Sequence, residues 1–118
     1  MWRDDAFLLD MMLAARKVLD FTQEITREQF QTDELLQNAV MRQIQIIGEA
    51  ARKISLECQE EHAEIQWQEI IGMRNRLVHE YFSIIPERVW DVVEKDIPEL
   101  IRLIEPLVPP DSPPAVDD

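Results

Sequence analysis

The stretch that decides the fold is residues 32–58, TDELLQNAVMRQIQIIGEAARKISLEC. Its apolar residues recur every three or four positions, which places them on one face of an α-helix. This stripe comprises Leu36, Val40, Ile44, Ile47, Ala51, Ile54 and Cys58. Thr32, Asp33 and Glu34 suit the start of the helix, because a small polar cap and acidic side chains favour the positive end of the helix dipole. We therefore predict one long helix from about residue 32 to about residue 58.

Gly48 lies inside this predicted helix and is followed by two alanines, Ala50 and Ala51. A glycine in a helix interior costs about 1 kcal/mol relative to alanine. The small side chains make this part of the helix thin, so we expect a second helix to approach it closely and compensate for the cost. The alternative is a tolerated glycine without a role.

Residues 4–25 on the N-terminal side also have helical spacing, with an apolar face wide enough to contact more than one neighbour. Thr26 and Gln29 fit a capping box, which predicts a short helical turn ending near Phe30.

Two more helices are predicted on the C-terminal side. The third contains residues 67–82, and the fourth begins at Pro86, a favoured first residue of a helix. Pro98 lies inside the fourth helix and predicts a kink near residues 95–97 or a split into two shorter helices. No segment has strand periodicity, so we predict an all-α fold, an antiparallel bundle of four to five helices.

Composition limits the function. A chain of 118 residues forms one domain, which we assign to residues 1–108, followed by a Pro- and Asp-rich tail, residues 109–118, predicted to be disordered. Only Gly48 and Gly72 are glycines, which excludes a Gly-rich phosphate loop, and the single cysteine, Cys58, excludes an intrachain disulfide. A net charge of −12 argues against a broad basic surface for nucleic acid. No apolar run approaches the roughly 20 residues of a membrane span, so we expect a cytoplasmic protein.

The third helix contains an anomaly. Its apolar stripe predicts an apolar residue at position 74, but the residue there is an arginine. Burying an unpaired guanidinium is very costly. Arg74 is therefore expected to be either a member of a structural ion pair or an anion-binding residue.

A more polar strip on the same helix contains Gln68, Gly72, Asn75 and His79. Gly72 would let a ligand or a second subunit approach the backbone there. Arg74 is about 140° around the helix from His79, so one copy does not bring the two together. Two copies related by a two-fold axis would bring both pairs into one cleft.

Residues 72–82, GMRNRLVHEYF, resemble the signature of HepT-like HEPN proteins: an arginine, a polar residue, three further residues, a histidine, one residue and a tyrosine. Other parts of the chain are similar to the family in order and rough spacing. These are residues 47–51, Trp67, residues 89–90 and residues 96–100. The resemblance extends from about residue 5 to about residue 107.

This resemblance implies a HEPN-like bundle that forms a homodimer with a composite site. Such a protein would be an endoribonuclease that cuts RNA without a metal or cofactor, and the toxin of a toxin–antitoxin pair. The antitoxin would be a small nucleotidyltransferase, MNT, that transfers AMP to the motif tyrosine. Arg74, Asn75 and His79 would be the catalytic residues and Tyr81 the modified one.

The chemistry of these side chains is consistent with RNA cleavage. Imidazole titrates near neutral pH and serves as base or acid, and a guanidinium matches phosphate oxygens. Asn75 would orient the phosphate or the imidazole. Glu49 would either pair with Lys53, four residues away, or hold Arg74, and the spacing leaves both options open.

Two other charged side chains have simpler interpretations. For Arg76, spacing favours a surface ion pair with Glu80 over an RNA contact. We expect no metal site at His62, because no second ligand recurs at metal-site spacing.

The acidity of the chain is an objection to the nuclease, because it repels RNA away from the motif. The competing class is a non-catalytic nucleotide- or phosphate-binding partner subunit of a minimal nucleotidyltransferase. In that class Arg74 would bind phosphate without cleavage. A structural dimerisation protein is a third class. Phosphate binding alone would not require His79, which favours the nuclease.

Overall fold

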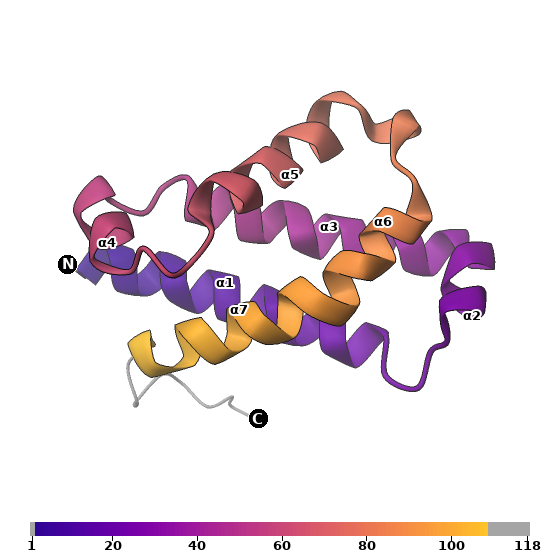
Figure 1. Cartoon of the computed structure of the whole chain (residues 1–118), viewed down its shortest axis with the longest axis horizontal. Helices are drawn as coiled ribbons and strands as arrows, with labels where there is room; N and C mark the ends of the chain where they lie inside the picture. The colour runs from indigo at the N-terminus through magenta and orange to yellow at the C-terminus, as the bar shows by residue number, and fades with distance from the viewer. Residues whose placement is uncertain (1, 109–118) are drawn as a thin grey trace.

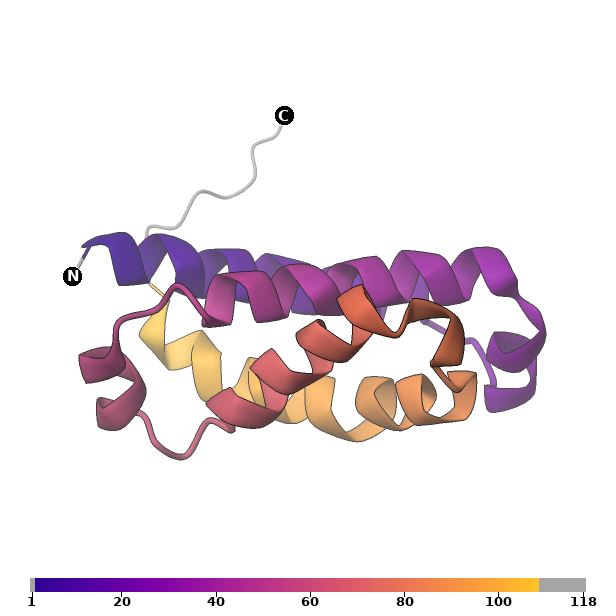
Figure 2. The same ribbon diagram turned by 90° about the horizontal axis from the view of Figure 1, so that it is seen from above.

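The structure is a computed structural model and describes residues 2–108. The predicted disordered tail, residues 109–118, lies outside the described residues. Helix α1 (Trp2–Phe21) runs antiparallel to α3 (Glu34–Ala51), and the short α2 (Arg27–Thr32) joins them (Figure 1). Helix α5 (Trp67–His79) packs on α3, and α7 (Ile97–Ile104) packs on α1. Seen from above, α1 and α3 form one layer, and α5 and α7 form the other (Figure 2). Within residues 2–108 there is no strand, so the predicted all-α fold is confirmed.

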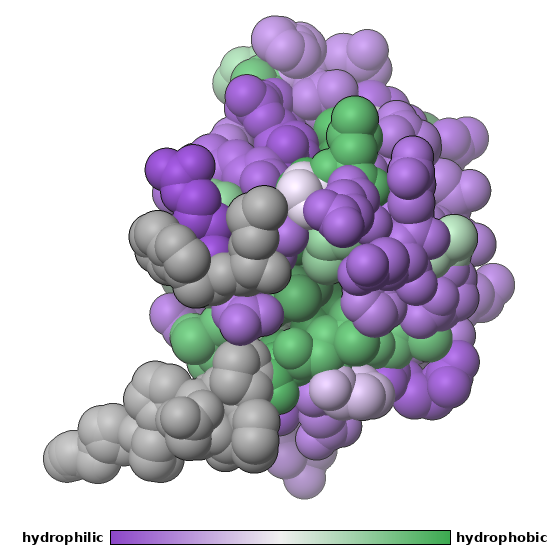
Figure 3. Space-filling view, turned by 90° about the vertical axis from the view of Figure 1, so that its left-hand side faces the viewer, coloured by the Kyte–Doolittle hydropathy of each residue, from purple (hydrophilic) through white to green (hydrophobic). Residues whose placement is uncertain are grey.

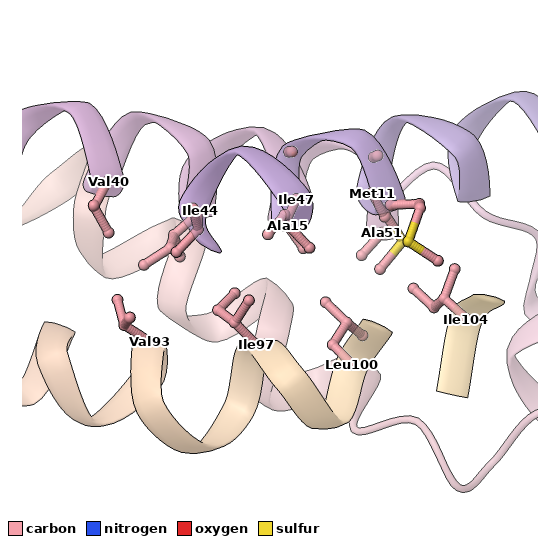
Figure 4. Close-up of a cluster of buried hydrophobic side chains, with 14 of the residues drawn as sticks. Met11, Ala15, Val40, Ile44, Ile47, Ala51, Val93, Ile97, Leu100 and Ile104 are labelled. Atoms are coloured by element: carbon pink, nitrogen blue, oxygen red, sulfur yellow. The ribbon is translucent and has the colours of Figure 1, made fainter. Parts of the chain in front are cut away.

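Apolar side chains from both layers form the core, which follows the predicted stripe of α3 (Figure 4). Several are almost completely buried and make contacts across the layers. The side chains labelled in the close-up are Met11, Ala15, Val40, Ile44, Ile47, Ala51, Val93, Ile97, Leu100 and Ile104. The burial of the predicted stripe explains why α3 packs against both α1 and α5.

The predicted capping box is present at the start of α2. The Thr26 hydroxyl accepts a hydrogen bond from the Gln29 amide at 3.1 Å, and the Gln29 side chain accepts one from the Thr26 amide at 2.8 Å. The first helix ends at Phe21, earlier than predicted, and the chain turns through Glu24, whose φ of 61° lies in the left-handed region.

The prediction of one helix over residues 32–58 is wrong at its C-terminal end. Helix α3 ends at Ala51, and a separate short helix, α4 (Leu56–Glu61), follows. The buried Asp4 carboxylate of α1 accepts hydrogen bonds from the Ser55 amide at 2.9 Å and the Ser55 hydroxyl at 2.7 Å. The Ser55 hydroxyl in turn accepts from the Cys58 amide and caps α4. This contact with α1 fixes Ser55 in an extended conformation, which interrupts the helix.

The fourth predicted helix is divided as expected near Pro98. Helix α6 (Pro86–Asp91) continues into a π-helical turn, η2 (Val92–Asp96), and then into α7. In this wider turn the Ile97 amide donates to the Val92 carbonyl, five residues earlier. The split therefore occurs by a change of hydrogen-bonding pattern. A short 3₁₀ turn, η3 (Glu105–Leu107), ends the described chain.

The third predicted helix is shorter than residues 67–82. Helix α5 ends at His79, and a 3₁₀ turn, η1 (Tyr81–Ser83), follows. Tyr81 therefore lies beyond the helix that carries Arg74, which corrects the prediction of one helix through residue 82. Within the described residues, none of the helices has the length and apolar character required to cross a bilayer.

Candidate active site

Arg74 lies where α5 packs closely against α3 at Gly48. A Cβ atom built on Gly48 would overlap the Arg74 Cβ, lie 2.9 Å from the Arg74 Cγ and lie 3.2 Å from the Ile70 carbonyl oxygen. Only glycine leaves room for this contact. The expectation that another helix approaches Gly48 is confirmed, and the approaching side chain belongs to Arg74.

The Arg74 guanidinium is held by two neighbours. Its Nε and Nη2 donate to Oε2 of Glu49 at 2.9 and 2.6 Å, and its Nη1 donates to Oδ1 of Asn75 at 2.9 Å. The side chain is only 15% exposed. Arg74 is therefore a member of an ion pair, one of the two roles that the sequence left open. A guanidinium has five N–H donors, and these contacts use three, which leaves one donor each on Nη1 and Nη2.

Glu49 is the partner of Arg74 and not of Lys53. The hydrogen bond from Arg74 lowers the pKa of the Glu49 carboxyl, and this effect outweighs burial, which acts in the opposite direction. The Lys53 ammonium lies over the Phe7 ring, 5.9 Å from its centre. The ionised Glu49 carboxylate fixes the orientation of the arginine, because it accepts from two nitrogens of the same planar group.

His79 is the last residue of α5, and its side chain is exposed. It makes no hydrogen bond or ion pair with any residue of the described part of the chain. Gln68 and Asn75, on the same strip of α5, are also exposed, and a Cβ on Gly72 would meet nothing within 4 Å. The structure thus brings Arg74, Asn75 and Glu49 together, whereas His79 lies on the open side of the same helix.

Tyr81 contacts α3 from the turn that follows α5. Its hydroxyl donates a hydrogen bond to Oδ1 of Asn38, and its ring packs edge-on against Phe82, with 5.1 Å between ring centres. Asn38 and Glu49 are eleven residues apart, so they differ by about 20° around α3 and lie about 16.5 Å apart along it. Tyr81 and Arg74 therefore make their hydrogen bonds with residues on the same face of α3.

Apolar side chains are exposed at the C-terminal end of α5 and in the turn that follows it. Phe82 is 98% exposed and Ile85 is 51% exposed, and Val78 and Tyr81 are also in contact with solvent. Exposed apolar residues that gather in one place mark an interaction surface more often than single ones do. We call Val78, Tyr81, Phe82 and Ile85 the apolar tip.

Arg76 does not form the predicted surface pair with Glu80. Within residues 2–108 its hydrogen bond is from Nη2 to Sδ of Met73, at 3.3 Å. It lines a groove of about 810 Å³ between α5 and α7, which does not include Arg74 or His79.

Figure 3 shows the end of the molecule that contains the N-terminus, where apolar surface lies between hydrophilic side chains.

His62 lies outside the site. Its Nδ1 is 3.9 Å from a carboxylate oxygen of Glu64. Among the residues that the structure describes, no three His, Cys, Asp or Glu side chains gather closely enough to hold a metal ion.

Asn38 is a residue of the site that the sequence did not predict, and it contacts the candidate residue Tyr81. The signal lies in residues 32–58, where polar or charged residues also recur at helical spacing. These are Asn38, Arg42, Gln45 and Glu49, separated by four, three and four positions. A row of this kind opposite the apolar stripe is the ordinary pattern of a solvated face, so the sequence alone does not distinguish it from one.

Comparison with known proteins agrees with the motif. The family described as "Ribonuclease HepT-like" matches residues 11–107. A protein of Thermococcus cleftensis named "Probable ribonuclease HepT" is 39% identical over 101 residues, which cover 86% of this chain and 92% of that protein. "Putative RNase MJ1380" of Methanocaldococcus jannaschii is 36% identical over 100 residues, 85% of this chain and 92% of that protein. No solved structure matches significantly. The chain therefore belongs to the HepT-like ribonuclease family.

Proposed function

We propose that the protein is an endoribonuclease with a composite active site formed by two copies of the chain. One observation carries this proposal. Arg74 is oriented by Glu49 and Asn75 with two N–H donors left, and His79 stands free on the adjoining open face of α5. A fixed anion-binding group and an unengaged imidazole are the pair of groups that phosphodiester cleavage requires, and two copies of the chain would bring them together.

RNA supplies the nucleophile itself. A histidine takes the proton of the 2′-hydroxyl as its oxygen attacks phosphorus, and a second acid gives a proton to the departing 5′-oxygen. Arg74 stabilises the charge that develops on the phosphate oxygens, and Asn75 holds one edge of the guanidinium. One chain supplies one His79, so two copies divide the roles of base and acid. No metal ion or cofactor is needed for these steps.

The homodimer would use the open face of α5 together with the apolar tip. Gly72 leaves its backbone accessible to a second chain. The nearly fully exposed Phe82 and the half-exposed Ile85 would bury their apolar surface away from water only on association. A two-fold axis along this face would place both Arg74 and both His79 side chains around one cleft.

We further propose that this ribonuclease is a toxin that an MNT-type nucleotidyltransferase neutralises. The transfer of AMP from ATP, with pyrophosphate as the leaving group, would form a phosphodiester on the Tyr81 hydroxyl, which is partly exposed and bonded to Asn38. The modification adds a negative charge and a nucleoside to the row of α3 that also holds Arg74. Both would oppose the entry of an RNA strand, one by repulsion and one by bulk.

The test is RNA cleavage in EDTA by the purified protein and its variants. We expect Arg74→Ala and His79→Ala to lower the rate by about 10²-fold or more, in the range of single catalytic groups. His62→Ala and Arg102→Ala are matched controls on the only other histidine and on an exposed, ion-paired arginine, and both should cleave as the wild type does. Equal cleavage by all five proteins would reject the active site. Nucleotide binding that depends on Arg74, without any cleavage, would instead support the phosphate-binding partner subunit.

A further inference from the structure

One row of side chains on α3 runs beneath the candidate site. It consists of Asn38, Arg42, Gln45 and Glu49, which lie within about 60° of one another around the helix. At one end Asn38 accepts the hydrogen bond from Tyr81, and at the other Glu49 accepts those from Arg74. Arg42 therefore lies between the two contacts, about 6 Å along α3 from Asn38 and about 10.5 Å from Glu49.

Arg42 differs from Arg74 in its surroundings. Its side chain is exposed, and within residues 2–108 it has no carboxylate within ion-pair distance and makes no hydrogen bond. The positive charge of Arg74, by contrast, is paired with the carboxylate of Glu49, with 2.6 Å between Nη2 and Oε2. Arg42 is thus an unneutralised cation on the surface row that connects Arg74 to Tyr81.

The net charge of the chain makes such a cation important. With 12 basic and 24 acidic side chains the protein repels a polyanion over most of its surface. An RNA strand that reaches Arg74 must find local positive charge beside it, and a free guanidinium is the side chain best matched to phosphate oxygens. We propose that Arg42 binds a backbone phosphate of the RNA between Arg74 and Tyr81.

This proposal rests on the proposed ribonuclease function and adds a substrate-binding residue to it. Arg42 holds the strand in place and does not take part in bond breaking. A phosphate contact contributes to binding without regard to sequence, and it releases counterions, so its loss changes the dependence of affinity on salt. A purely structural role would not change that dependence.

The experiment measures binding of a fluorescent, single-stranded 2′-O-methyl RNA by anisotropy over a range of salt concentrations. This probe lacks the 2′-hydroxyl and cannot be cleaved by transesterification, so binding is measured whether or not the protein is a nuclease. We compare Arg42→Ala and Arg42→Lys with Arg3→Ala. The control removes an exposed arginine of α1 that has no ion pair within the described residues.

For Arg42→Ala we expect the Kd to rise about fivefold at about 0.1 M salt, and the slope of log Kd against log salt to fall by about 0.7, the effect of one phosphate contact on a single strand. Arg42→Lys should keep most of the slope, and Arg3→Ala should match the wild type. Circular dichroism checks that each variant is folded.

Two results would overturn the proposal: no binding of the probe by the wild type, or an Arg42→Ala variant with the same Kd and slope as Arg3→Ala. Failure of this proposal is separable from failure of the proposed function. If the wild type cleaves RNA but Arg42→Ala binds normally, only the Arg42 contact is rejected. If the wild type cleaves no RNA but Arg42→Ala loses binding and slope, the contact stands and the nuclease is rejected.

Discussion

The two sides of α5 differ in how they are fixed. The side that faces α3 carries Arg74 in a closely packed seam with Gly48, and its guanidinium is bonded to Glu49. The outer side carries Asn75 and His79, whose side chains are exposed. Arg74 therefore has an orientation set within one chain, whereas His79 has no contact of that kind among residues 2–108.

This difference separates two kinds of functional residue. A side chain in the seam serves both stability and the proposed chemistry, so its substitution should affect both. A side chain on the outer face should affect association or catalysis with little change in the stability of the protomer. Substitutions in the seam should therefore have the largest effects on stability, and substitutions in the apolar tip the smallest.

The largest effect should come from closing the space at the seam. Gly48→Ala forces its new methyl group into Arg74, and we expect the free energy of unfolding to fall by about 1–3 kcal/mol, the cost of overpacking. Gly72→Ala is the matched control, because its methyl group meets nothing and alanine is the better helix former. It should raise the free energy of unfolding by up to about 1 kcal/mol. Urea unfolding measures both, and changes of the same sign would contradict the difference between the two sides.

A smaller loss should follow from removing the carboxylate of the seam. We expect Glu49→Gln to lower the free energy of unfolding at neutral pH by about 1–2 kcal/mol, less than a fully buried pair would lose because the Glu49 side chain is 35% exposed. Glu99→Gln is the control. Its carboxylate pairs with Arg102 on the exposed surface, and its removal should have no measurable effect.

The contribution of Glu49 should depend on pH. Its pKa is lower in the folded chain than the ordinary value, so the stabilisation is complete above the unfolded carboxyl pKa of about 4.3 and is lost as the pH falls through the folded pKa. The difference in unfolding free energy between the wild type and Glu49→Gln should therefore be constant near neutral pH and shrink below about pH 4. A difference that grows on acidification would contradict the pair.

The smallest effect on stability should come from the apolar tip. Phe82 is almost fully exposed, so Phe82→Ser should leave the unfolding of the protomer nearly unchanged and shift the proposed dimer toward monomer in sedimentation experiments. Leu56→Ser removes an apolar side chain of α4 that is 73% exposed, and it should leave the association unchanged. If Phe82→Ser sediments like the wild type, the apolar tip is not the dimer surface.

Most of the fold followed from patterns within short segments. The capping box at Thr26 and the apolar stripe of α3 are local, and both are present in the structure. Arg74 could be identified from the sequence because it places a charge at an apolar position of a helix. Gly48 could be identified because it is a glycine in a helix interior. The candidate site was harder to predict, because helical spacing allows two partners for Glu49 and favours Glu80, which the structure does not show, as the partner of Arg76.

The sequence by itself determined the helical class, the approximate positions of the helices and the motif that marks the family. Only the tertiary structure decided that α3 stops at Ala51, that Arg74 is bonded to Glu49 and that Tyr81 reaches Asn38. The physical reason is distance along the chain. Caps and periodicity depend on residues three or four positions apart, whereas the contacts made by Asp4, Arg74 and Tyr81 join residues 51, 25 and 43 positions apart. Such contacts exist only after the helices have packed, because packing selects one partner among several that local spacing allows.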